Sequence, residues 1–200
     1  MTAHGRLPWL EPHELAAEAR ALYDRITGGP RASGPRAFPL TDDAGRLHGP
    51  FNAMLFNPAI GSALQELGAA IRYRGSLPDR AREIAILELA VLRGSSFEWY
   101  AHARAGKAAG LSDEEIAALH DGAAVPTLDP LEAMVRELVR VLVRERDLDE
   151  SAYAAAAQRL GLAPLTELIA LVGYYDLLAL SLRVFRTPLP AGAPPAFAEP

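Results

Sequence analysis

The sequence contains no cysteine among its 200 residues. Without thiols the chain cannot form disulfides, thiolate nucleophiles, dithiol redox pairs or sulfur-ligated zinc sites. Lysine is almost absent as well, because Lys107 is the only one among 20 basic residues, and this bias toward arginine is typical of a GC-rich bacterial genome. The excess of 25 acidic over 20 basic residues gives a formal net charge of −5, which argues against nucleic acid as a partner.

Targeting and membrane signals are also missing. The first twelve residues hold one arginine, two prolines and no continuous apolar stretch, unlike a secretory signal. The most apolar segment runs from Leu165 to Phe185. Three charged residues interrupt it, so it falls short of the roughly 20 nearly uninterrupted apolar residues of a membrane helix. We therefore predict a soluble, cytoplasmic protein with no membrane partner, in which this segment is a buried helix.

Strand signals are hard to find, whereas alanine, leucine, glutamate and arginine recur at helical spacing between glycines and prolines. We predict an all-α protein with about eight helices. The expected helices cover residues 12–26, 57–75, 79–93, 95–109, a short stretch after the capping box at Ser112, 129–146, 149–160 and 164–185. The helix at 79–93 is apolar nearly all round and should be central.

Three regions are expected along the chain. Residues 1–50 hold an N-terminal helix and a Gly/Pro-rich arm, 51–187 a helical domain, and 188–200 a proline-rich tail. The length of the segment 27–50 predicts a lid, a binding segment or a packed arm. The tail is expected to wrap a neighbour or to stay mobile.

The candidate chemistry lies on two consecutive helices. Glu98 and His102 are four residues apart, so they project from the same helix face. Glu83 lies near the start of the preceding helix, and the short connection at Gly94 predicts antiparallel neighbours, which brings Glu83 toward His102. Two carboxylates and an imidazole on buried helices can form an acid/base cluster.

Simpler structural interpretations exist for the same region. A glutamate–histidine pair at this spacing is also common on solvated helix faces, and Trp99 is of a type that usually belongs to a core or an interface. Arg80 and Arg82 are either interface or anion-binding groups, or are solvated. Glu88 is expected to pair with a buried arginine such as Arg72, Arg93 or Arg104.

A metal site is not predicted. Di-iron bundles use Glu-x-x-His pairs from two helices, whereas this chain has one Glu-x-x-x-His with Glu83 as the only further ligand. The other histidines have no partner at convincing ligand spacing, so we expect structural or surface roles for His4, His13, His48 and His120.

Three blocks of sequence carry a resemblance to a known family. They are LPDRAREIAIL at 77–87, FEWYAH at 97–102 and AAGLSDEEI at 108–116. In order and spacing they resemble the carboxymuconolactone decarboxylase family of the alkyl hydroperoxidase D-like superfamily. The later segments LVGYY at 171–175 and FRTPLP at 185–190 are similar to longer members, so the resemblance covers roughly residues 50–190. It implies a multi-helix alkyl hydroperoxidase D-like bundle that assembles as a trimer or hexamer.

The resemblance also bears on the reaction. The peroxidase branch of the superfamily uses a glutamate, a Cys-x-x-Cys pair and a histidine. Glu83 and His102 fall on the glutamate and histidine positions, but Ser95 and Glu98 replace the two cysteines. These residues cannot cycle between dithiol and disulfide, so thiol peroxidase activity is excluded. The remaining pattern, Glu-Trp-x-x-His, is that of the decarboxylase-like branch.

The resemblance therefore implies a cofactor-independent enzyme that acts on a small carboxylated lactone or enol acid. His102 would deliver a proton to carbon, Glu98 would fix its tautomer or share the proton, and Glu83 would orient it or tune its charge. The two carboxylates are expected to raise at least one of their pKa values. We assign Ser95, Trp99 and Asn52 to substrate binding.

Two alternatives remain open. The same groups would serve isomerisation, hydration or dehydration, and cyclisation next to a carbonyl. A non-catalytic helical binding or scaffold protein with the same fold is the alternative from another class. Independently of the resemblance, the apolar segment 165–185 offers more hydrophobic surface than one 200-residue domain needs to bury, which favours a homo-oligomer.

Overall fold

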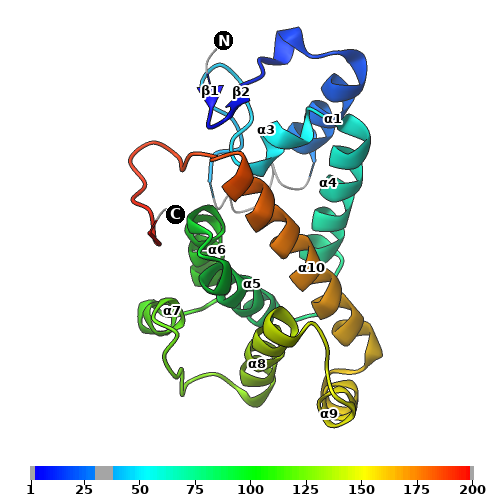
Figure 1. The fold of residues 1–200 in the computed structure, drawn as a ribbon, viewed down its shortest axis with the longest axis vertical. Coiled ribbons are helices and arrows are strands. Elements are labelled where there is room, and N and C mark those ends of the chain that lie inside the picture. The colour runs from blue at the N-terminus through cyan, green and yellow to red at the C-terminus, as the bar shows by residue number, and fades with distance from the viewer. Residues whose placement is uncertain (1–2, 30–37, 199–200) are drawn as a thin grey trace.

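The computed structural model describes residues 3–29 and 38–198. Within these residues the chain forms nine α-helices, a small N-terminal hairpin and one 3-10 turn, so the predicted all-α fold is confirmed (Figure 1). The hairpin consists of β1 (Ala3–His4) and β2 (Leu7–Pro8), followed by η1 (Pro12–Glu14). The helices are α1 (Ala17–Gly28), α3 (Pro50–Met54), α4 (Pro58–Tyr73), α5 (Asp79–Arg93), α6 (Ser96–Ala108), α7 (Asp113–His120), α8 (Pro130–Glu145), α9 (Glu150–Leu160) and α10 (Leu162–Val184).

Helix ends follow local chemistry. Ser112 and Glu115 form the predicted capping box of α7, in which each side chain accepts a hydrogen bond from the other residue's backbone N–H. Asp129 and Glu132 form a second capping box, at the start of α8. Helix α5 ends at Gly94, whose φ of 58° is the left-handed conformation that favours glycine.

Two expectations at the N-terminus were wrong. The helix expected from Pro12 begins at Ala17, because residues 12–14 form a 3-10 turn and Leu15 and Ala16 are extended. The hairpin of residues 3–8 was not predicted, since strands of two residues leave no alternating pattern to detect. The hairpin is attached to the end of α10, where the backbone N–H of Arg6 donates to the carbonyl of Phe185 at 2.7 Å.

Helix α5 is central, as predicted. It packs against α6, α8 and α10 (Figure 1). Its residues 81–90 are all buried. Glu88, in the middle of this stretch, pairs with Arg136 and Arg140 of α8, with an Nε–Oε distance of 2.6 Å in each case. The buried ion pair was predicted, but not with these arginines, because the packing of α8 on α5 decides which guanidinium arrives.

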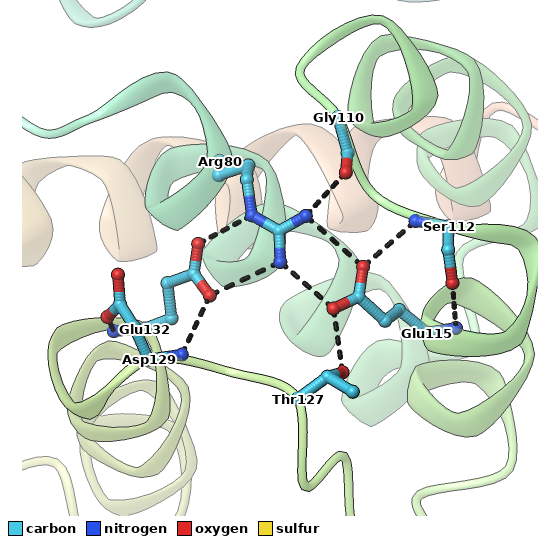
Figure 2. Close-up of polar contacts among 7 residues, drawn as sticks. All are labelled: Arg80, Gly110, Ser112, Glu115, Thr127, Asp129 and Glu132. Atoms are coloured by element: carbon cyan, nitrogen blue, oxygen red, sulfur yellow. Dashed lines mark hydrogen bonds and ion pairs between the residues drawn. The ribbon is translucent and has the colours of Figure 1, made fainter.

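Arg80, at the start of α5, joins three helices (Figure 2). Its guanidinium lies between two carboxylates, with Nε 2.6 Å from Glu132 Oε1 and Nη2 3.0 Å from Glu115 Oε1, and it also donates to the carbonyl of Gly110. Both glutamates are capping-box residues of their own helices. Arg80 therefore binds internal carboxylates, and the network fixes the end of α5 that carries Glu83.

Helix α10 crosses the other elements and packs on α3, α4, α5, α8 and α9. By its length and by the composition of its most apolar window, α10 could cross a membrane, so its three charged residues alone do not exclude a span. Half of that window is buried inside the fold, which is typical of a core helix.

The described parts of the arm and of the tail pack on the chain itself. In the arm, Thr41 and Leu47 form an antiparallel bridge and Phe38 lies edge-on to Phe97 of α6 at 5.0 Å, so the packed-arm alternative holds for residues 38–49, while residues 30–37 lie outside the described part. In the tail, the backbone N–H of Phe197 donates to Ser96 Oγ at 3.1 Å. The last two residues, 199–200, are outside the described chain.

Candidate acid/base site

Glu83, Glu98 and His102 meet where α5 and α6 lie against each other. His102 Nδ1 is 2.7 Å from Glu83 Oε2, and His102 Nε2 is 3.5 Å from Glu98 Oε2. None of the three residues is more than 4% exposed. The structure thus brings together the three residues that the spacing on two antiparallel helices predicted to converge.

The charge of Glu83 is set by its surroundings. Burial raises the pKa of its carboxyl group, but the imidazole of His102 and the guanidinium groups of Arg72 and Arg82 outweigh burial and hold the pKa below its usual value. The rise expected in at least one of the two carboxyl pKa values therefore does not occur at Glu83. Because an ionised carboxylate only accepts hydrogen bonds, His102 donates its Nδ1–H to Glu83, and Nε2 is the nitrogen that faces Glu98.

A cavity of about 50 Å³ adjoins the imidazole. Its polar wall contains Glu98, His102 and Arg72, and most of the remaining wall is apolar or aromatic. The volume suits a few water molecules, whereas pockets that hold organic ligands usually measure roughly 300–1,000 Å³. Its apolar and aromatic walls include Phe38, Leu40, Phe51, Phe97, Tyr174 and Tyr175.

Arg72 of α4 is a site residue that sequence reasoning missed. Burial lowers the pKa of its guanidinium, but Tyr175, Tyr73 and the two site glutamates raise it above its usual value, so the group stays cationic. Its Nε is buried and has no hydrogen-bond partner among the described residues. A buried cationic N–H without a partner is a donor available to an anion in the cavity.

Tyr175 of α10 is the second residue that was missed, although it lies in one of the segments that carry the family resemblance. Its ring stands edge-on to the imidazole of His102, with the centroids 5.1 Å apart. Burial raises the pKa of its phenol well above the usual value. Tyr175 is therefore a neutral group that holds the imidazole in place.

None of the three residues assigned to substrate binding lines this cavity. Asn52 is fully buried, and its amide joins the N-terminal segment by donating to the carbonyl of Pro8 at 3.0 Å and accepting from the N–H of Leu10 at 3.1 Å. Trp99 packs edge-on to His120 at 5.0 Å on another face of α6. Ser95 precedes the first turn of α6 and lines a different pocket.

The described residues contain no group of three or more histidine, aspartate or glutamate side chains arranged to hold a metal ion. The chemistry that this site can perform with its own side chains is proton transfer. His102 supplies the titratable nitrogen, Glu83 fixes its tautomer, and Arg72 supplies positive charge.

Comparison with known proteins gives first the fold and then the family. A crystal structure from Ralstonia eutropha JMP134, described as an uncharacterized peroxidase-related protein with an alkylhydroperoxidase AhpD core, matches with a TM-score of 0.70. The match covers 96% of this chain and 95% of that chain at 14% identity, so it shows an AhpD-like all-helical fold. The model of the carboxymuconolactone decarboxylase family matches residues 58–141, so this part of the chain is similar to that family. No curated protein matches the sequence.

Proposed function

We propose that this protein is a cofactor-independent acid/base enzyme that decarboxylates a small carboxylated lactone or enol acid. The observation that carries the proposal is the Glu83–His102–Glu98 cluster beside a cavity that also presents Arg72. The family match over residues 58–141 includes all four residues.

Such a reaction has two parts. The bond between the carboxylate carbon and the lactone carbon breaks, CO₂ leaves, and the electron pair passes into the conjugated carbonyl to form an enolate. The enolate then takes one proton on carbon. No cofactor is needed, because the substrate's own carbonyl accepts the electrons, and the protein has to stabilise the negative charge and supply the proton.

The site residues divide these tasks. His102 delivers the proton from Nε2, the nitrogen on the side of Glu98 and the cavity. Glu83 stabilises the protonated imidazole and keeps Nδ1 occupied, and Glu98 shares the proton on Nε2. Arg72 binds the anionic substrate and the enolate through its buried, unpaired Nε–H.

Substrate binding requires the cavity to enlarge, because 50 Å³ is too small for a lactone acid. Phe38 and Leu40 of the arm form part of its wall. They are attached to a chain segment rather than to a helix of the core, so their displacement is the least costly way to admit a ligand.

The experiment is a screen of carboxylated butenolides and enol acids, with CO₂ release measured and the products examined by NMR in D₂O. We expect CO₂ release and one deuterium on carbon, and a loss of roughly 100-fold or more in turnover for His102→Gln. Arg72→Gln should raise KM more than it lowers kcat. Arg144→Gln, an exposed arginine on α8, is the matched control and should leave turnover unchanged.

The outcomes separate the alternatives. Deuterium exchange without CO₂ release would indicate isomerisation or a related proton transfer. A ligand that raises the melting temperature but is never turned over would favour the non-catalytic binding protein. Full turnover by both His102→Ala and Glu98→Ala would overturn the acid/base assignment.

The same proposal includes self-association. Several large apolar side chains on the outer side of α10 are exposed, namely Leu162, Ile169, Leu177, Leu180 and Val184. A second copy of the chain would bury them, in line with the trimer or hexamer implied by the family resemblance. Sedimentation at micromolar protein concentration should give a species larger than 21.5 kDa, and a monomer would contradict this part of the proposal.

A further inference from the structure

A second and larger pocket lies between the start of α6, the end of α10 and the C-terminal segment. Its volume of about 470 Å³ is in the range that accommodates a small organic ligand. It is separate from the acid/base cavity, and the ring of Phe97 lines both.

The wall of this pocket is cationic. Arg93, Arg183 and Arg186 line it, and none of the described residues in its wall is acidic. Arg183 donates to the carbonyl of Arg93 at 3.0 Å and forms no ion pair with a carboxylate of the described chain. Its guanidinium therefore has no direct ion-pair partner among the described residues.

Arg93 is only partly neutralised. Its Nε is 2.5 Å from Asp176, a residue outside the pocket wall that also pairs with Arg146. Its Nη2 is buried and has no hydrogen-bond partner among the residues that the structure describes. One carboxylate thus serves two guanidinium groups, and one buried N–H donor of Arg93, a residue of the pocket wall, is left without a hydrogen-bond partner in the described chain.

The N-terminal turn of α6 adds partial positive charge to the same pocket. Ser95 is the N-cap residue and lines the pocket, but its hydroxyl makes no capping hydrogen bond to the helix. The N-terminal N–H groups of a helix carry partial positive charge, and here the cap leaves them without the usual side-chain acceptor.

We propose that this pocket binds a small organic or inorganic anion with carboxylate or phosphate oxygens. Guanidinium groups present paired N–H donors that match both kinds of oxyanion. The inference rests on this pocket alone and stands whether or not the acid/base cavity catalyses decarboxylation.

The test is a titration of the full-length protein with inorganic phosphate and with succinate, in which binding is measured by calorimetry. The ionic strength is kept constant, and sodium chloride serves as the reference titrant. At least one of the two anions should bind, and the one that binds tells a phosphate site from a carboxylate site. We expect Arg183→Gln to raise Kd about tenfold or more, because a charge-assisted hydrogen bond is lost.

Two variants serve as controls. Arg144→Gln removes the same charge and, like Arg183→Gln, one hydrogen bond to a backbone carbonyl, but it lies on α8 away from the pocket, so its Kd should equal that of the wild type. Arg72→Gln should also bind normally. The proposal is overturned if neither anion binds, if Arg183→Gln and Arg144→Gln weaken binding equally, or if Arg72→Gln alone abolishes it, since binding would then occur in the acid/base cavity.

Discussion

The network around Arg80 should make the stability of the protein depend on the ionisation of Glu115. Hydrogen bonds from the Arg80 guanidinium lower the pKa of Glu115 from 4.5 to about 2 (Figure 2). At about 1.4 kcal/mol per pKa unit, this shift corresponds to at most about 3.5 kcal/mol of stability. The side chain of Arg80 is 26% exposed, so solvent screening reduces the expected value to about 2 kcal/mol.

The perturbation is Glu115→Gln. Glutamine still accepts the hydrogen bond of the capping box, so the change removes charge rather than the cap. At pH 7 we expect the variant to lose about 2 kcal/mol in its free energy of unfolding. Because the pKa of Glu115 is lower in the folded state, its contribution is complete above pH 4.5 and is lost as the pH falls toward 2.

Urea unfolding followed by circular dichroism, at fixed protein concentration and at several pH values from 7 to 2.5, measures this difference. The gap between wild type and variant should narrow below pH 4.5. Glu114→Gln is the matched control, since Glu114 lies in the same first turn of α7 but forms no ion pair with an arginine of the described chain. A difference in unfolding free energy that stays constant across this pH range would contradict the stabilisation by the Arg80–Glu115 pair. An equal loss of stability in the control would contradict it as well.

Three further predictions concern other parts of the molecule. Phe38→Ala opens the wall of the acid/base cavity and should lower KM for the proposed substrate in steady-state assays, whereas a raised KM would show that Phe38 forms part of the binding surface. Glu88→Gln leaves Arg136 buried without a full counter-charge and should cost about 3 kcal/mol in urea unfolding; a loss below 1 kcal/mol would contradict the buried ion pair. Burial lowers the pKa of His4 from 6.5 to about 4, so the wild type should lose stability relative to His4→Phe as the pH falls from 6.5 to 4, and parallel stability profiles would disprove this.

Local signals were sufficient to predict most of the helices. The capping box at Ser112 and the glycine at position 94 act within a few residues, so the sequence displays the whole interaction. The meeting of Glu83 with His102 was also predictable, because a short connection makes consecutive helices antiparallel and adjacent.

The remaining site residues depend on contacts between distant segments. Arg72 comes from α4 and Tyr175 from α10, and no pattern within either helix indicates that it will face α6. The same limit explains Glu88, whose arginine partners lie 48 and 52 positions away in the sequence. The contacts of Asn52, which was assigned to substrate binding, likewise involve Leu10 and Pro8, 42 and 44 positions away in the sequence.

The contact between Glu83 and His102 has a consequence for the order of events in the proposed reaction. Nδ1 is occupied by Glu83, so in the proposed reaction the imidazole regains its proton through Nε2, on the side of Glu98, which lines the cavity. Substrate and replacement proton must use the same opening. When the product of the proposed reaction fills this cavity, the acid is recharged only after the product has left, so product release and recovery of the proton become one step of the proposed cycle.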